Sequence, residues 1–107
     1  MITCFIRYEI DPFGKADFEE YARAWGRAIP RCGADLIGYY APHEGSATTA
    51  YAVYNIENLA AYEAYRARLA ADPQGQANYA FAQEKRFILK EDRIFLRHVS
   101  GPSAGSR

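Results

Sequence analysis

Apolar and polar residues alternate along residues 2–10, at the start of the chain. A period of two places successive side chains on opposite faces of an extended segment, and the β-branched and aromatic content also favours a strand. The more apolar face holds Ile2, Cys4, Ile6, Tyr8 and Ile10, and the opposite face holds Thr3, Phe5, Arg7 and Glu9. We expect the more apolar face to line the core.

After this strand the apolar spacing changes to three and four residues, which is typical of a helix with one buried face. The apolar stripe consists of Phe18, Tyr21, Ala22, Trp25, Ala28 and Ile29. Asp11 is a suitable N-cap and Pro12 a suitable first helical residue, but Gly14 interrupts, so regular helix is predicted to begin near Lys15. Gly33 is well placed to end the helix in the left-handed conformation.

The middle of the chain repeats this order of strand and helix. Residues 36–42 and 48–56 are predicted to be strands, joined by a turn-forming cluster of hairpin length. Asn58 can cap a second helix, which Asp72 and Pro73 close. The apolar positions of this helix are Leu59, Tyr62, Tyr65 and Leu69.

The last third of the chain gives weaker signals. Residues 74–83 have no clear apolar period, and we expect a short helical segment there. Residues 86–99 are predicted to be the final strand, bent or bulged around residues 91–93. The low-complexity residues 100–107 are expected to be a mobile tail. The chain is therefore divided into one domain, residues 1–99, and this tail.

The predicted order of elements is β-α-β-β-α-β, and the two helices carry the same tyrosine pattern when Tyr62 is aligned with Tyr21. Because crossover connections are right-handed, this order gives a four-stranded antiparallel sheet with both helices on one face. The predicted fold class is therefore α+β, with the ferredoxin-like arrangement.

The second face of this sheet is left without helices. Strict alternation places on it Phe5, Arg7, Tyr39, Tyr51 and Val53. Monomers rarely expose apolar patches larger than a few hundred Å². We therefore expect a homodimer in which this sheet face packs on the same face of a second copy.

Composition excludes several classes of partner. The chain of 107 residues is long enough for one core, and its 13 basic and 13 acidic residues cancel. It has no basic block, so we expect no nucleic-acid partner and no anionic membrane surface. No apolar run approaches about 18 residues, and no leader opens the chain, so no membrane segment is predicted. Cys4 and Cys32 are expected to be reduced thiols in a cytoplasmic protein.

Four segments in order resemble the NIPSNAP family. They are Ile-Thr-Cys-Phe-Ile-Arg-Tyr-Glu-Ile-Asp-Pro at residues 2–12, Phe-Glu-Glu-Tyr-Ala-Arg-Ala-Trp at 18–25, Gly-Tyr-Tyr-Ala-Pro-His-Glu-Gly at 38–45 and Ala-Ala-Tyr-Glu-Ala-Tyr-Arg at 60–66. The resemblance covers residues 1–99. It implies a dimeric α+β barrel, and it implies no established reaction.

His43 and Glu44 are the sharpest candidates for catalysis. Histidine titrates near neutral pH and can act as a general base, with a carboxylate to orient it. Neighbouring residues in an extended segment point in opposite directions, however, so the two side chains need not touch. Arg7 or a tyrosine hydroxyl would stabilise developing negative charge on oxygen. The structural alternatives are a solvated hairpin histidine and an ion pair between subunits, and His98 is a weaker candidate.

A second group of residues is predicted to bind a small apolar or aromatic ligand. It consists of Tyr39, Tyr51, Trp25, Tyr62 and Arg66. Buried tyrosine hydroxyls need partners and can leave polar groups facing a cavity. The structural alternative is core packing for Trp25 and Tyr62 and a solvated side chain for Arg66. Two histidines without Cys/His spacing give no zinc site, and we predict no metal and no cofactor.

The leading hypothesis is a homodimer of undetermined biochemical role that binds a small apolar or aromatic ligand. The rival is an enzyme, because dimeric α+β barrels also include cofactor-independent monooxygenases, haem-degrading enzymes and isomerases. A third reading is an interaction module whose aromatic residues only form the dimer. A cavity of about 300 Å³ or more with convergent polar groups would favour the first two readings.

Overall fold

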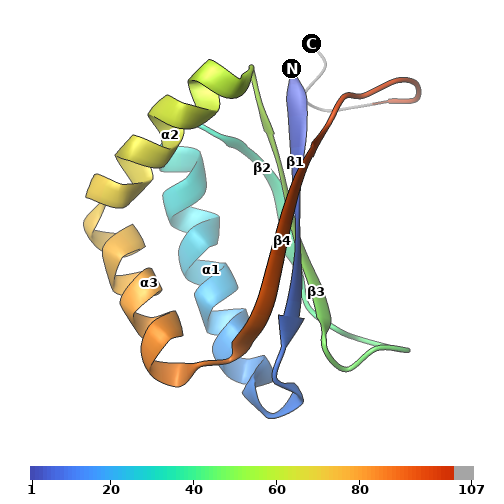
Figure 1. Cartoon of the computed structure of the whole chain (residues 1–107), viewed down its shortest axis with the longest axis vertical. Coiled ribbons are helices and arrows are strands. Elements are labelled where there is room, and N and C mark those ends of the chain that lie inside the picture. Colours follow the sequence, from blue (N-terminus) through green and yellow to red (C-terminus); the bar gives the residue numbers. More distant parts are fainter. Residues whose placement is uncertain (103–107) are drawn as a thin grey trace.

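The computed structural model describes residues 1–102 (Figure 1). The elements are β1 (Ile2–Ile10), the short 3-10 turn η1 (Pro12–Gly14), α1 (Lys15–Arg31), β2 (Asp35–Tyr40), β3 (Thr49–Ile56), α2 (Leu59–Ala71), α3 (Pro73–Lys85) and β4 (Ile88–Leu96). Residues 103–107, most of the tail predicted to be mobile, lie outside the described part. Within that part, no helix combines the length and apolar character that crossing a membrane requires.

The four strands form one antiparallel sheet in the order β2-β3-β1-β4. All three helices lie on one face of this sheet, with α2 and α3 packed end to end beside α1 (Figure 1). The predicted α+β, ferredoxin-like fold is therefore confirmed, with α3 as an additional helix. We call the sheet face without helices the open face.

Aromatic side chains fill the core between helices and sheet. Tyr21, Trp25, Tyr62 and Tyr65 are all buried there, as the helical spacing indicates. Cys4 is fully buried as well, and its thiol is free. The repeated tyrosine pattern therefore records how the helices pack on the sheet.

Local capping fixes the ends of the helices. The Asp11 side chain accepts a hydrogen bond from the Phe13 amide, and Asn58 caps α2 by accepting one from Ala61. Gly33 follows α1 with φ +108°, a backbone conformation that glycine adopts without steric cost. These caps follow from short-range sequence signals, and the predicted start of α1 at Lys15 is confirmed.

The third helix is longer than the short segment predicted for residues 74–83, because it spans 13 residues from Pro73 to Lys85. Asp72 closes α2 and also caps α3, since its side chain accepts a hydrogen bond from the Gly75 amide. The buried Asn78 donates a hydrogen bond of 3.0 Å to the Tyr21 carbonyl oxygen of α1. Caps and packing on α1, rather than an apolar period, therefore hold this helix.

The bulge predicted around residues 91–93 is not at these residues but earlier in β4. Residues 90–96 pair with β1 in continuous register, with Glu91 opposite Tyr8 and Arg93 opposite Ile6. The irregularity comes earlier, where Ile10 pairs with Ile88 and the register shifts. Glu91 and Arg93 consequently share the helix-side face of the sheet with the buried side chains of β1.

The prediction that Tyr39 points away from the helices is also wrong. The register of β2 against β3 shifts between Leu36 and Gly38, so that Ile37 is an extra residue. Tyr39 therefore lies opposite the buried Ala52 and packs against the core. A bulge of one residue exchanges the two faces of a strand, which strict alternation along the sequence does not anticipate.

Candidate functional site

A cavity of about 80 Å³ lies between the helices and the sheet. Seven of the nine tyrosines of the chain line it, and we call it the tyrosine cavity. These are Tyr8, Tyr21, Tyr39, Tyr54, Tyr62, Tyr65 and Tyr79. Trp25, Arg66, Glu91 and Arg93 also contribute to its lining. Polar hydroxyls and charged groups thus converge on a small space inside an aromatic core.

Aromatic contacts between different elements hold the wall of this cavity. The rings of Tyr8 on β1 and Tyr39 on β2 stack with their centroids 6.2 Å apart. Their hydroxyl oxygens are 3.3 Å apart, within hydrogen-bonding distance. Tyr21 packs edge-on against Trp25 at 5.8 Å, and Trp25 against Tyr79 of α3 at 5.0 Å. Such edge-on and offset pairs are the preferred arrangements of aromatic rings.

Burial raises the pKa of several tyrosines that line the cavity. Desolvation raises the pKa of Tyr21 to about 12 and raises the pKa of Tyr8 and Tyr39 well above the ordinary value. Removing a phenol from water disfavours its charged form, which is the physical cause of these shifts. At neutral pH each of these hydroxyls is therefore uncharged and can donate a hydrogen bond.

Charged groups at one side of the cavity come from the edge strand β4 and from α2. Arg93 donates a hydrogen bond of 2.8 Å to Glu91, and each side chain is about a third exposed. The guanidinium of Arg66 lies 5.6 Å from the centre of the Tyr62 ring, within cation–π distance. Because these groups are only partly buried, the charged side of the cavity is in contact with solvent.

A groove of about 500 Å³ adjoins this cavity between α3 and β4. Tyr21, Tyr79 and Glu91 line both spaces, so they form the boundary between them. The rest of this α3–β4 groove is lined by Ala82, Gln83, Arg86, Ile88 and Leu89. The groove is therefore the approach to the tyrosine cavity along the edge of the sheet.

The open face carries a separate set of apolar residues. Five large hydrophobic side chains are exposed on it, namely Ile37, Tyr40, Tyr51, Ile94 and Leu96. A pocket of about 630 Å³ lies over part of this face, next to Phe5, Val53 and His98. The face is thus apolar and concave at that end.

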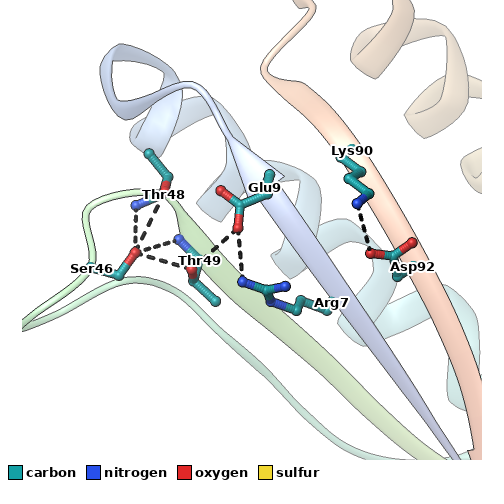
Figure 2. A network of polar contacts seen from close by, with 7 residues as sticks. All are labelled: Arg7, Glu9, Ser46, Thr48, Thr49, Lys90 and Asp92. Carbon is teal, nitrogen blue, oxygen red and sulfur yellow. Dashed lines mark hydrogen bonds and ion pairs between the residues drawn. The ribbon is translucent and has the colours of Figure 1, made fainter.

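Polar contacts occupy the other end of the open face (Figure 2). Arg7 pairs with Glu9 on the same strand at 3.1 Å, and Thr49 of β3 donates a 3.5 Å hydrogen bond to Glu9. Lys90 and Asp92 pair on the neighbouring strand β4 at 3.6 Å. Arg7 therefore lies on the face opposite the tyrosine cavity, where its charge is already balanced.

The structure does not bring the predicted catalytic residues together. His43 and Glu44 are both exposed in the β2–β3 loop, and neither lines the tyrosine cavity or the α3–β4 groove. Arg7 is on the open face, and His98 lies beyond the end of β4. Within residues 1–102, no cluster of three or more His, Cys, Asp or Glu side chains could hold a metal ion.

Four of the five residues predicted to bind a ligand do line one cavity, namely Trp25, Tyr39, Tyr62 and Arg66. The fifth, Tyr51, lies on the open face. Glu91 and Arg93 line the cavity without having been predicted as site residues. The sequence signal for them is their place in the alternation of β4. Glu91 and Arg93 are charged residues on the same face of the strand as Phe95, which is apolar and packs on the core. Charges on the core side of an edge strand indicate a cavity there.

The fold matches solved structures over almost the whole chain. The chain belongs to the NIPSNAP family, since the family model matches residues 3–101. The resemblance noted in the sequence is therefore confirmed. No curated protein matches the chain.

Solved structures share this fold at low sequence identity. An uncharacterised NIPSNAP domain protein from Burkholderia xenovorans is 23% identical over 100% of this chain and 99% of its own, with a TM-score of 0.73. A NIPSNAP family protein from Agrobacterium tumefaciens is 23% identical over 98% and 95%, with a TM-score of 0.74. A putative antibiotic biosynthesis monooxygenase from Nitrosomonas europaea is 8% identical over 94% and 100%, with a TM-score of 0.71. At these identities the likeness shows the fold alone.

Proposed function

We propose that this protein is a homodimer that binds a small apolar or aromatic ligand at the tyrosine cavity. The observation that carries the proposal is the convergence of seven tyrosines and Trp25 on one space between helices and sheet. Aromatic side chains offer flat apolar walls, and their hydroxyls fix the orientation of a ligand through hydrogen bonds.

The volume of the cavity limits how the ligand is held. At about 80 Å³ it is smaller than the pockets of about 300 Å³ or more that enclose drug-sized ligands. It is also smaller than the cavity of about 150 Å³ that holds a benzene molecule in an engineered protein core. Only a group of a few atoms enters the cavity, so the body of the ligand lies in the adjoining α3–β4 groove.

Binding fits the arrangement better than general-base catalysis by His43 does. A general base must lie within hydrogen-bonding reach of the proton that it removes, or within reach through one water molecule. His43 is exposed in the β2–β3 loop and does not line the cavity. The titratable groups that do line it are tyrosines, two arginines and Glu91.

The open face supports dimerisation. Its exposed apolar side chains include Ile94 at 52% and Leu96 at 48% exposure; Phe5 lies opposite Ile94 on β1, and Val53 lies opposite Phe5 on β3. A second copy that packs its own open face on this one would remove these groups from water. The same face is used by both copies, as a twofold interface requires.

Ligand binding is tested by titrating the full chain with phenol and benzyl alcohol and following the fluorescence of Trp25, its single tryptophan. We expect a saturable change that is lost in Leu69→Phe, because Leu69 lines the cavity. Leu59→Phe is the matched control, since Leu59 is 59% exposed on the same helix. Circular dichroism shows that both variants are folded. Equal titrations of both variants, or no saturable change in the original protein, would refute binding at this cavity.

Dimerisation is tested by sedimentation at micromolar concentration. We expect a dimer for the original protein and a monomer for Ile94→Glu, because a carboxylate in the middle of an apolar interface is left desolvated and unpaired. Leu59→Glu adds the same charge at an exposed position outside the sheet and should leave the dimer intact. A monomeric original protein would contradict this part of the proposal.

A further inference from the structure

Cationic groups outnumber carboxylates around the tyrosine cavity and the α3–β4 groove. Arg66 and Arg93 line the cavity, and Arg86 lines the groove. Glu91 is the single carboxylate among the residues that line the two spaces. The whole chain carries equal numbers of basic and acidic residues, so this local excess of positive charge is not a consequence of composition.

Two of the three arginines lie on the cavity side, and three of the five residues that line only the groove are apolar. Arg93 and Arg66 line the tyrosine cavity but not the groove, whereas Ala82, Ile88 and Leu89 line the groove but not the cavity. The two spaces meet at Tyr21, Tyr79 and Glu91. A molecule that spans them therefore meets Arg66 and Arg93 at the cavity end, and at the groove end a surface of Ala82, Ile88 and Leu89 beside the single cation Arg86.

Arg93 retains donors for a second anion. Its pair with Glu91 uses the Nη2 nitrogen alone. A guanidinium carries five N–H donors in a planar fork that matches the two oxygens of a carboxylate. Neutral tyrosine hydroxyls in the cavity add further donors, and none of these groups carries a negative charge that would oppose the anion.

Resting on the proposed function, we infer that the ligand is an apolar or aromatic carboxylate. Its carboxylate enters the tyrosine cavity beside Arg93 and Arg66, and its apolar body lies in the α3–β4 groove. The small cavity volume agrees with a headgroup of three heavy atoms. Glu91 competes with the ligand for Arg93 and therefore weakens binding.

The experiment compares anions with neutral molecules of the same shape on the full-length protein. Benzoate and phenylacetate are titrated against Trp25 fluorescence at neutral pH, in parallel with benzamide and phenylacetamide. Because Arg93 is about a third exposed, solvent screens its charge, and we expect the carboxylates to bind about tenfold more tightly than the amides. Added salt should reduce that preference, since exposed charges are screened.

Charge-removing variants assign the preference to named residues. We expect Arg93→Gln to remove the preference for carboxylates while leaving amide binding nearly unchanged, and Arg66→Gln to reduce it less. Glu91→Gln should have the opposite effect to the two arginine variants and strengthen carboxylate binding several-fold. Arg27→Gln is the control, because Arg27 is exposed on α1 outside both spaces and its loss changes the net charge equally.

The outcomes separate the inference from the proposal on which it rests. Equal affinity for carboxylates and amides, or an unchanged preference in Arg93→Gln, would overturn the inference and leave ligand binding at the cavity intact. If neither carboxylates nor amides nor phenol gives a saturable change, the proposed function fails and the inference fails with it.

Discussion

The hydroxyl oxygens of Tyr8 and Tyr39 lie 3.3 Å apart, although their strands are not neighbours in the sheet. β3 separates β1 from β2, so both side chains reach across the face of β3 that the helices cover. Their rings stack at a centroid distance of 6.2 Å. This pair joins the edge strand β2 to the central strand and forms part of the wall of the tyrosine cavity.

Removing one hydroxyl of this pair should destabilise the protein, because the other hydroxyl stays buried without its partner. Tyr39→Phe leaves the Tyr8 hydroxyl without this partner, and an unsatisfied buried polar group costs about 1–3 kcal/mol. Tyr8→Phe should act similarly. The double variant should lose less than the sum of the two, because it removes both polar groups. Urea unfolding of the four proteins measures this coupling, and strictly additive losses would contradict it.

The buried tyrosines should also make stability fall at high pH. The pKa of Tyr21 is raised by desolvation from 10.0 to about 12, so the folded state holds its proton where the unfolded state releases it. Stability from this group is complete below pH 10 and is lost as the pH rises through 12. Burial raises the pKa of Tyr8, Tyr39 and Tyr65 as well, and adds to the loss.

Tyrosinate absorbance and circular dichroism, recorded together during an alkaline titration, measure this coupling. We expect a group of tyrosines to ionise only as the helical signal disappears. Tyr21→Phe should lessen the loss of stability between pH 10 and 12, because it removes one of the linked groups. Ionisation of all nine tyrosines with the fold intact would contradict the prediction.

Much of this fold was predictable from short-range patterns, and the site was only partly so. The alternation in β1 and the spacing of Tyr21 and Trp25 reflect burial directly, so both were assigned correctly. The face of Tyr39 depends on the bulge at Ile37, which is a property of pairing with β3. Gly38 beside it is a local sign of a bulge, because glycine within a strand often marks one.

The cavity itself could not be derived from periodicity. It depends on how α3 packs beside β4, the strand that follows it after two residues, and on Glu91 and Arg93 facing the helices. The expected bend at these residues would have obscured which way they point. The regular register of β4 against β1 is what places them beside the tyrosines.

The ion pair between Arg31 and Asp72 should give the protein an acid-sensitive contribution to stability. The hydrogen bond from Arg31 is the main cause that holds the pKa of Asp72 below its ordinary value of 3.8, and the Gly75 amide adds to it. A depressed pKa contributes stability that is present above pH 3.8 and is lost as the pH falls through the lower folded value.

Asp72→Asn isolates the charge, because asparagine also serves as an N-cap for α3. Its melting temperature should lie below that of the original protein at neutral pH, and the difference should shrink below pH 3.8. Arg31→Gln should show the same loss, and combining the two changes should add little. A pH-independent difference would show that the charge of Asp72 is not its cause.

Alanine at Gly75 and at Gly26 should have opposite effects. A Cβ at Gly75 would lie 2.7 Å from the Leu69 carbonyl oxygen and 3.5 Å from the Trp25 ring, so α3 must shift. We expect a loss of about 1–3 kcal/mol, as in other overpacked sites. Gly26, in α1, has no atom within 4 Å of such a Cβ, and Gly26→Ala should gain about 0.4–1 kcal/mol. Chemical denaturation measures both, and a stabilised Gly75→Ala would refute the close approach.

Deleting Ile37 should leave the fold and the tyrosine cavity in place. In the observed register Leu36 lies opposite Tyr54 and Gly38 opposite Val53, with Ile37 extra, so its removal makes the pairing continuous. Tyr39 would still lie opposite Ala52 and beside Tyr8. We expect a loss within the range of about 0.5–3 kcal/mol that single substitutions commonly cause.

Deleting Ala52 from β3 is the matched control, because that strand pairs with β1 without a bulge. A shift of one residue there would exchange the buried and open faces of half the strand, and the variant should not fold. Thermal unfolding and Trp25 fluorescence distinguish the two deletions. If the protein without Ile37 unfolds while the protein without Ala52 does not, then the bulge is not what turns Tyr39 toward the helices. If only the protein without Ala52 unfolds, the extra residue in β2 is dispensable for folding, and its exposed side chain is free to contribute to the open face.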